Sequence, residues 1–394
     1  MEYRYERQKL SAVFDIISGG TPKRSVSDYW GGDIPWISIQ DFNDRSRFID
    51  CTEEFISEEG FKNSSTNILE KRDIIISARG TVGKVNIIGS PMAFNQSCYG
   101  LRVRDNIYYL FAYYSLINSI RELKVRSYGS VFSTITKRTF DEVEINVFNF
   151  CDQLRVSALL GSLDSKIELN NKIITNLEAQ AQAIFKSWFV DFEPFQDGEF
   201  VESELGLIPE GWMVSTTGRE FDIEYGKNLP TKHLLEKGYP VFGGNGQIGF
   251  FKEYLYEKPR ILVSCRGAAS GKVGFSKPYS YVTNNSLVFN EKKGEYFYYF
   301  KYLFNGIQFE NYVTGSAQPQ LTIANSKDIK ILIPNKETVI RFNIIVGPYF
   351  TTQLTLSEQS TTLAQIRDTL LPKLMSGEID VSNIKIEPEE IGHV

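Results

Sequence analysis

The sequence is poor in the residue types that build metal and redox sites. Its 394 residues include two histidines and four cysteines. The cysteines are scattered without a CxxC pair, which argues against a zinc site and for reduced thiols. They are Cys51, Cys98, Cys151 and Cys265. His233 and His393 have no partner of ligand type nearby, so we expect both at the surface and predict no metal site.

Long apolar runs are missing as well. The first ten residues, "MEYRYERQKL", contain no apolar segment of the signal-peptide kind, and runs such as "IYYLFAYYSLI" are too short to span a bilayer. We therefore expect a cytoplasmic protein that makes no membrane contact. A hydrophobic content of 42 % is enough for a core in each of the two or three domains that this length predicts.

Catalytic motifs are also lacking. "RGTVGKVN" (79–86) and "RGAASGKVG" (266–274) look like phosphate-binding loops, but the glycine spacing is too short and valine replaces the hydroxyl residue that would hold magnesium. "GNGQIG" (244–249) has no helical pattern after it, as a dinucleotide site would require. We predict glycine-rich turns between strands, with a basic residue at each end.

The sequence does contain a repeat that covers almost the whole chain. "YYLFAYYSLINSIREL" (108–123) aligns with "EYFYYFKYLFNGIQFE" (295–310), and the segment 128–147 aligns with 314–333. Each copy then continues into a long helical pattern, at 151–189 and 337–375. The order is therefore a globular unit and a long helix, followed by a second globular unit and a second long helix.

The first helical pattern has the seam of a coiled coil, because its apolar positions alternate spacings of four and three. Those positions are Val156, Leu160, Leu163, Ile167, Asn170, Ile174, Leu177, Ala181, Ile184 and Trp188. Only Asn170 interrupts the apolar run, and we interpret it as a device that fixes helix register.

The second helical pattern has a related but more polar stripe. It comprises Phe342, Ile345, Tyr349, Leu356, Leu363, Ile366 and Leu370, diluted by Thr352 and Gln359. Pro348 is expected to kink this helix or to mark its start. Because both helices are copies that need an apolar partner, we predict that they pack on each other, antiparallel, in a pseudo-twofold α+β molecule.

Charge is distributed unevenly along the chain, whose net charge is −5. Residues 71–138 hold eleven basic and three acidic side chains, and residues 258–330 hold ten and four. Residues 151–210, by contrast, hold four basic and eleven acidic side chains. Basic surface interleaved with Tyr, Asn, Gln and Ser is typical of phosphate contacts and base reading, and it recurs in both copies.

Together, the repeat, the long helices and the short motifs of this sequence resemble the specificity subunit of type I restriction-modification systems. The resemblance rests on the order of units and helices, on "ISGGTPK" (17–23), on the "RG" and "GKV" turn in each half and on "LEAQAQAIFKSWFVDFEPF" (177–195). It covers essentially the whole chain, although "EYGKNLPTK" (224–232) departs from the first unit's "GGTPK". The absence of catalytic motifs agrees with it, since "GPYF" (347–350) lacks most of an adenine-N6 methyltransferase tetrapeptide and "FDIEYGK" (221–227) lacks the strand context of a nuclease.

The resemblance implies a non-enzymatic subunit that binds double-stranded DNA. Two target-recognition domains, 1–150 and 211–333, would each read half of an asymmetric bipartite site, and the helical regions 151–210 and 334–394 would act as a ruler. The helices would bind two methyltransferase subunits, which two restriction subunits join, and S-adenosylmethionine, ATP and magnesium would belong to those partners. The alternatives are a solitary methyltransferase or nuclease fragment, or a scaffold with no DNA role.

Two sets of residues follow as candidates. The DNA-binding candidates are Thr21, Lys23, Arg24, Arg79, Lys84, Asn95, Gln96, Ser130, Lys137, Lys227, Lys232, Asn245, Gln247, Arg266, Lys272, Asn284, Asn285, Ser316 and Gln318. The candidates for helix pairing and partner binding are Leu160, Leu163, Ile167, Asn170, Ile174, Leu177, Ile184, Trp188, Tyr349, Leu356, Leu363 and Leu370.

Overall fold

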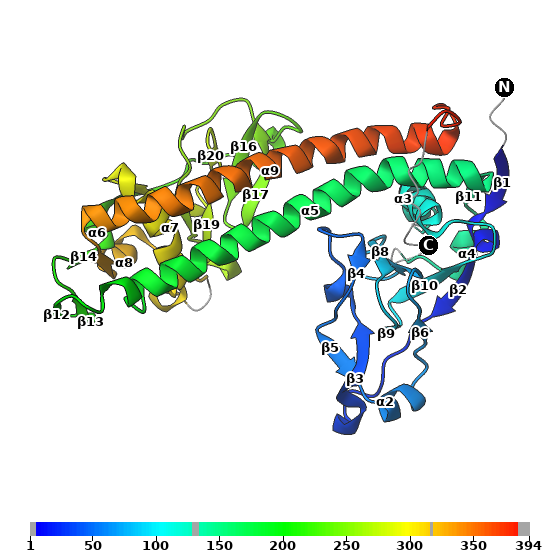
Figure 1. The fold of residues 1–394 in the computed structure, drawn as a ribbon, viewed down its shortest axis with the longest axis horizontal. Helices are drawn as coiled ribbons and strands as arrows, with labels where there is room; N and C mark the ends of the chain where they lie inside the picture. The colour runs from blue at the N-terminus through cyan, green and yellow to red at the C-terminus, as the bar shows by residue number, and fades with distance from the viewer. Residues whose placement is uncertain (1–4, 128–133, 316–317, 385–394) are drawn as a thin grey trace. The chain divides into compact units, whose positions relative to one another are not determined.

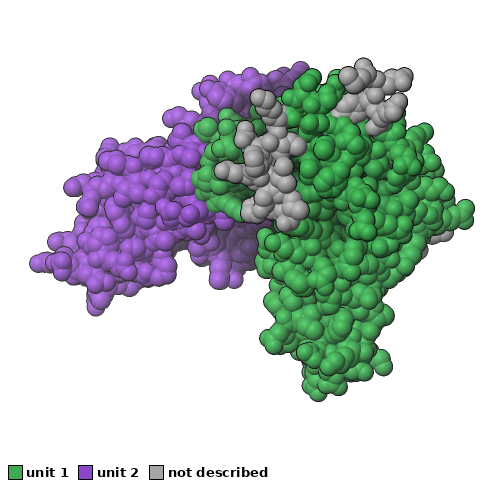
Figure 2. All heavy atoms as spheres, turned by 45° about the vertical axis from the view of Figure 1, so that its right-hand side comes forward, with its two compact units in different colours: residues 1–174, 355–394 green, residues 175–354 purple. Residues whose placement is uncertain are grey.

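The computed structural model describes residues 5–127, 134–315 and 318–384 (Figure 1). It divides into two compact units, and each boundary falls inside a long helix. Unit 1 comprises residues 1–174 and 355–394, and unit 2 comprises residues 175–354 (Figure 2). The predicted boundaries at 150, 210 and 333 remain a prediction from the sequence.

Unit 1 is built on two sheets and one short strand pair. Its elements are β1 (Tyr5–Lys9), α1 (Leu10–Val13), β2 (Phe14–Ser18), β3 (Trp30–Ile37), β4 (Phe48–Ile49), β5 (Glu54–Ile56), α2 (Glu58–Lys62), β6 (Ile68–Leu69), β7 (Ile74–Ser77), β8 (Val85–Ile88), β9 (Met92–Phe94), β10 (Cys98–Val103), α3 (Tyr109–Ser127), α4 (Lys137–Asp141), β11 (Glu144–Phe148) and the first part of α5 (Phe150–Phe189). The larger sheet has the strand order β2-β10-β7-β8-β4, the second sheet has the order β5-β3-β9-β6, and β1 pairs with β11.

Unit 2 repeats this plan. Its elements are β12 (Phe200–Ser203), β13 (Gly206–Pro209), β14 (Met213–Thr216), α6 (Thr217–Glu220), β15 (Phe221–Tyr225), β16 (Tyr239–Gly243), β17 (Gly246–Phe251), β18 (Ile261–Ser264), β19 (Val273–Phe275), β20 (Tyr281–Val282), β21 (Ser286–Glu291), α7 (Phe297–Gly306), α8 (Ile323–Lys327), β22 (Lys330–Ile333) and the first part of α9 (Lys336–Ser376). Its sheet β15-β21-β18-β19 matches β2-β10-β7-β8, and its pair β14-β22 matches β1-β11. The predicted internal repeat is thereby confirmed.

Each long helix begins after an asparagine at the same point of the repeat. The side-chain oxygen of Asn149 accepts a hydrogen bond from the backbone N–H of Asp152 at 3.0 Å, and that of Asn335 accepts one from Thr338 at 2.9 Å. These caps satisfy donors that the first helical turn leaves free. α9 runs without interruption from Lys336, so the expectation that Pro348 marks the helix start was wrong.

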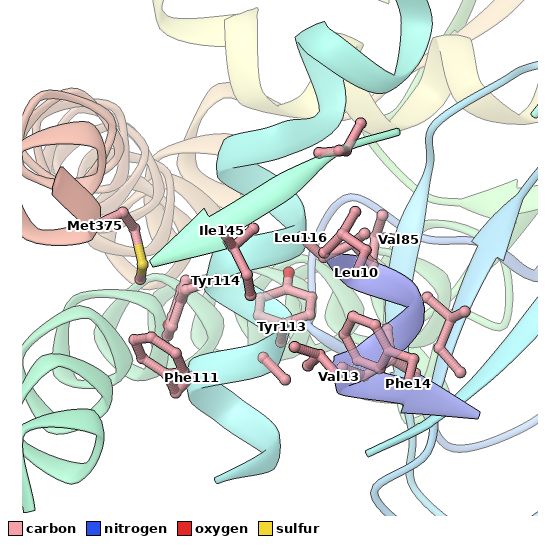
Figure 3. Close-up of a cluster of buried hydrophobic side chains, with 14 of the residues drawn as sticks. Leu10, Val13, Phe14, Val85, Phe111, Tyr113, Tyr114, Leu116, Ile145 and Met375 are labelled. Carbon is pink, nitrogen blue, oxygen red and sulfur yellow. The ribbon is translucent and has the colours of Figure 1, made fainter. Parts of the chain in front are cut away.

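The two long helices take part in the core of each unit. In unit 1, Leu374 and Met375 of α9 are buried with residues of α3 and β11. Figure 3 shows Met375 beside Phe111 and Tyr114 of α3 and Ile145 of β11. The core of unit 1 is therefore completed by a segment from the other end of the chain.

In unit 2 the shared core is strongly aromatic. Phe185 and Phe189 of α5 pack against Phe342 of α9, with ring centroids 6.2 Å and 5.0 Å away. Tyr299 of α7 lies 4.8 Å from Phe189 in the same cluster. Since α5 ends at Phe189, the predicted helical region 151–210 also contains the hairpin β12-β13.

Candidate nucleic-acid interface

A tight glycine turn joins β7 to β8 in unit 1. The backbone N–H of Ser77 donates to the carbonyl of Lys84, and the N–H of Gly83 donates to the carbonyl of Ser77, both at 2.9 Å. Gly80 has a φ of 72°, in the left-handed region that glycine adopts without a steric penalty. The prediction of a turn between strands is therefore confirmed, and Arg79 is carried at its start.

The turn from β18 to β19 in unit 2 is one residue longer, but matching backbone hydrogen bonds close it. The N–H of Ser264 donates to the carbonyl of Lys272, and the N–H of Gly271 donates to the carbonyl of Ser264, again at 2.9 Å. Gly267 has a φ of 73°, which matches its counterpart in unit 1. Arg266 therefore occupies the position that Arg79 occupies in unit 1.

Neighbouring loops converge on each turn. In unit 1, the N–H of Ala78 donates to the carbonyl of Ser97 at 2.8 Å, which joins the glycine turn to the β9-β10 turn. The equivalent bond in unit 2 runs from Cys265 to Asn285 at 2.9 Å. In each unit, these bonds bring segments that lie far apart in the sequence together on one surface.

Several candidate residues come together on these surfaces. In unit 1, the Thr21 hydroxyl donates to the side-chain oxygen of Gln96. In unit 2, the Nζ of Lys272 donates to the Oδ1 of Asn245 at 2.5 Å, and Gln318 lies next to Pro319, whose carbonyl accepts from Gly267.

Other candidates are placed as follows. Asn95 caps the β9-β10 turn by accepting from Ser97, and Asn284 precedes Asn285 between β20 and β21. Lys227 follows β15, Gln247 lies on β17 and Lys137 begins α4. Lys23 lies exposed on a loop, and Lys232 lies exposed in the short 3-10 helix Thr231–His233. Ser130 and Ser316 lie outside the described residues. DNA contact by any of these residues remains a prediction.

Arg24 is committed to contacts within unit 1. Its guanidinium donates to Glu54 at 2.8 Å and stacks on the ring of Trp30 at 3.7 Å. The hydrogen bond to Glu54 raises the pKa of Arg24. This side chain therefore holds the loop after β2 in place, a role that the sequence did not suggest.

The cations of the two glycine turns differ in their freedom. Lys84 forms an ion pair with Asp44 at 3.7 Å, and Lys272 is bonded to Asn245. Arg79 and Arg266 are exposed, and neither guanidinium has a hydrogen-bond or ion-pair partner among the described residues. The arginines are thus the cations best placed to meet a ligand.

The long helices run antiparallel within each unit. In unit 1, Asp164 bonds Arg367 at 2.6 Å, and further along α5 Asn170 bonds Gln359 at 2.8 Å, earlier on α9. Every predicted seam position of α5 is buried or half-buried. On α9, Ile366 is 43 % exposed, so its assignment to the stripe was wrong.

A buried ionic cluster fastens the sheet of unit 1 to α5, and sequence reasoning missed it. Arg47, which is 9 % exposed, bonds both carboxylate oxygens of Glu168, at 2.9 Å and 3.1 Å. Burial raises the pKa of Tyr114, so its phenol stays protonated and donates to Asp164 at 2.6 Å. These residues line a cavity of about 280 Å³ that Lys84 also borders.

Unit 2 has a different link at the corresponding place. Lys301 of α7, 5 % exposed, bonds Glu178 of α5 at 2.8 Å, and Gln353 of α9 bonds the same carboxylate at 3.2 Å. Glu178 loses solvation on burial, which would raise its pKa, but the hydrogen bond and charge of Lys301 leave that pKa below its ordinary value.

In the described part of the chain, no group of three or more His, Cys, Asp or Glu side chains could hold a metal ion. No helix there has both the length and the apolar character needed to cross a membrane. The first two residues of "GNGQIG" form the tip of the hairpin β16-β17, and the other four lie in strand β17, where a dinucleotide site would need a helix.

Comparison with known proteins places the chain in a family. The profile of the type I restriction modification DNA specificity domain matches residues 4–179 and 209–354. The chain is 30 % identical to the type I restriction enzyme MjaIX specificity subunit of Methanocaldococcus jannaschii, over 96 % of this chain and 94 % of that protein. It is 25 % identical to the EcoprrI specificity subunit of Escherichia coli, over 89 % of each chain.

A solved structure agrees on the fold. The S subunit of a type I restriction-modification system from M. genitalium superposes with a TM-score of 0.59 at 18 % identity, over 95 % of this chain and 96 % of that one. The profile alone matches most of the chain, in two segments that coincide with the repeat. The chain therefore belongs to the type I restriction-modification DNA specificity family.

Proposed function

We propose that each unit reads one half of a bipartite, asymmetric DNA site. The observation that carries this proposal is the repeated glycine turn, which presents Arg79 and Arg266 two residues after serines that make matching backbone hydrogen bonds. An arginine without an internal partner can bind guanine in the major groove through two hydrogen bonds, or can bind phosphate. Because the chain has two equivalent surfaces, each would contact its own half-site.

The two half-sites would differ because the side chains around the turns differ. Thr21 is bonded to Gln96 in unit 1, whereas Lys272 is bonded to Asn245 in unit 2. The basic stretches 71–138 and 258–330 would supply the salt-dependent attraction to the DNA backbone. Base-specific contacts would then come from the loops and general affinity from the surrounding charge.

The long helices would serve as spacer and docking surface for partners. The relatives are named as specificity subunits of restriction enzymes, which supports partner subunits that methylate and cleave DNA. We infer two methyltransferase subunits bound to α5 and α9, with two restriction subunits joined through them, in the cytoplasm. S-adenosylmethionine, ATP and magnesium would be held by those partners, and this chain would not itself catalyse a reaction.

Exchange of one reading surface tests this function. Residues 14–103 run from β2 through β10 and hold most of the unit 1 loops while leaving α3, α5 and α9 intact. Replacing them with the matching segment of the M. jannaschii relative should change one half of the DNA motif selected from a randomised duplex library and leave the other half unchanged. A change in both halves would show that the units do not read independently.

The alternatives have their own readout. A solitary methyltransferase would transfer labelled methyl groups from S-adenosylmethionine to DNA when the purified chain is the only protein present. A scaffold with no DNA role would select no motif from the library in any assembly. Either result would overturn the proposed function.

A further inference from the structure

The tip of the hairpin β16-β17 carries an amide whose orientation is fixed. Asn245 is exposed at the tip, and Gly246 beside it turns the chain with a φ of 106°. The Nζ of Lys272 donates to Oδ1 of Asn245 at 2.5 Å. Because an ammonium group has only donors, this contact assigns the oxygen of the amide to Lys272 and directs its NH₂ group elsewhere.

The hairpin tip rests directly on the glycine turn. A Cβ on Gly244 would lie 2.7 Å from the hydroxyl of Ser264 and 3.3 Å from the carbonyl of Asn285, so glycine lets the two segments approach closely. The backbone carbonyl of Lys272 is itself held by the N–H of Ser264 at 2.9 Å. Asn245 and Lys272 therefore sit on backbone segments whose separation is fixed.

A buried polar atom lies beneath this contact. Ser264 is 2 % exposed, and its hydroxyl has no hydrogen-bond partner among the described residues. In unit 1 the hydroxyl at the matching position, that of Ser77, donates to the carbonyl of Thr81 and accepts from the N–H of Lys84 at 2.8 Å. The polar pairing inside the unit 2 turn is thus less complete than in its copy.

The lysine of the other unit has a different partner. Lys84 lies at the place of Lys272, but its ammonium faces the carboxylate of Asp44 at 3.7 Å. The lysine-held amide is therefore a property of unit 2, which distinguishes the two surfaces.

We propose that Asn245 reads one base of the second half-site through its NH₂ group, and that Lys272 is the residue that positions it. This inference rests on the proposed function. In the major groove, guanine, adenine and thymine present acceptors, whereas cytosine presents the N4 donor. An amide with its NH₂ directed outward favours an acceptor edge and disfavours cytosine at that position of the contacted strand.

The test selects bound duplexes from a randomised library with the full chain, alone and assembled with a methyltransferase subunit. Asn245→Asp replaces the donor by acceptors, so one position of the second half-site should change to cytosine. Lys272→Met frees the amide to rotate and should reduce discrimination at that same position by about 5- to 150-fold, while Lys272→Arg, which keeps a donor, should retain it. The first half-site should stay the same in every variant.

Asn305→Asp is the matched control for charge. It makes the same substitution in unit 2 at an exposed residue of α7 that is not among the DNA-binding candidates. It should lower affinity without changing the position that Asn245 reads. If this variant also changed the same position to cytosine, the added negative charge alone would explain the change of base preference, and the inference would be overturned.

The remaining outcomes separate the inference from the proposed function. A wild-type chain that selects a bipartite motif, with that motif unchanged in Asn245→Asp and Lys272→Met, would overturn the reading role of Asn245 and leave the proposed function standing. A wild-type chain that selects no motif in either assembly would overturn the proposed function itself.

Discussion

Asn170 of α5, which has no solvent exposure, donates its side-chain amide to the side-chain oxygen of Gln359 on α9 at 2.8 Å. The Oδ1 of Asn170 has no hydrogen-bond partner among the described residues. Gln359 is one of the polar residues that interrupt the apolar stripe of α9. It is therefore the partner of Asn170, the one polar residue in the seam of α5. This pairing supports the interpretation of Asn170 as a register device, which lowers stability in exchange for specificity.

Substitution of Asn170 tests that interpretation. Asn170→Leu removes the unpaired buried oxygen and should raise the free energy of unfolding by about 1 kcal/mol. Asn170→Asp buries a charge without an opposing one and should lower it by about 2 kcal/mol or more. Urea unfolding of both variants checks the signs. A leucine variant that is clearly less stable than wild type would contradict the role assigned to Asn170.

The ion pair of Arg47 with Glu168 should behave as a buried link. Arg47→Met leaves the Glu168 carboxylate, 15 % exposed, without its cation and should cost about 3–5 kcal/mol of stability. The double variant Arg47→Met with Glu168→Leu should lose less, because no buried charge is left unpaired. A double-mutant cycle by denaturant unfolding measures the difference. Additive losses would mean that the two side chains are not energetically coupled.

Acid should lower the stability of unit 2 by protonating the carboxylate of Glu178. Its pKa is lowered in the folded chain from an ordinary value of 4.5, so its contribution to stability is complete above that value and is lost as pH falls through the lower, folded pKa. Glu178→Gln should therefore reduce the loss of thermal stability between neutral pH and pH below 4.5. The control is Glu210→Gln, a change at an exposed glutamate. The thermal stability of this variant should depend on pH as that of the wild type does.

The order of elements could be predicted from the sequence because it depends on local signals. The repeat, the seam spacing and the glycine turns are visible along the chain, and the paired strands and helices appear where those patterns occur. The hairpin β12-β13 was missed because the residues after the helical pattern 151–189 were included in the helical region 151–210.

The buried links could not be predicted in the same way. Arg47 and Glu168 are 121 residues apart, and neither lies on the coiled-coil seam that the spacing indicates. The contact of Lys272 with Asn245 likewise depends on how two loops meet in space. Composition could indicate a basic surface, but it could not show which cations are already paired inside the protein.

Lengthening the spacer should change the gap between half-sites. Because α5 and α9 pair in both units, four residues must be added to each helix, after 174 and after 354. One added turn lengthens each helix by about 6 Å, against about 3.4 Å per base pair, so the preferred gap should grow by one or two base pairs. Adding two residues to each helix should instead rotate the seam and disrupt pairing. Methylation mapping in cells that carry a methyltransferase partner measures the gap; an unchanged gap with intact methylation would assign spacing to another element.

Independent reading by the two units is tested most directly by comparing Arg79→Ala with Arg266→Ala, with methylated adenines mapped in such cells. We predict that each variant relaxes one or more positions in a different half of the motif, at a cost of about 1–3 kcal/mol if the arginine reads guanine, with the other half and the gap unchanged. A wild-type motif in both variants, or relaxation of both halves by either single change, would contradict it.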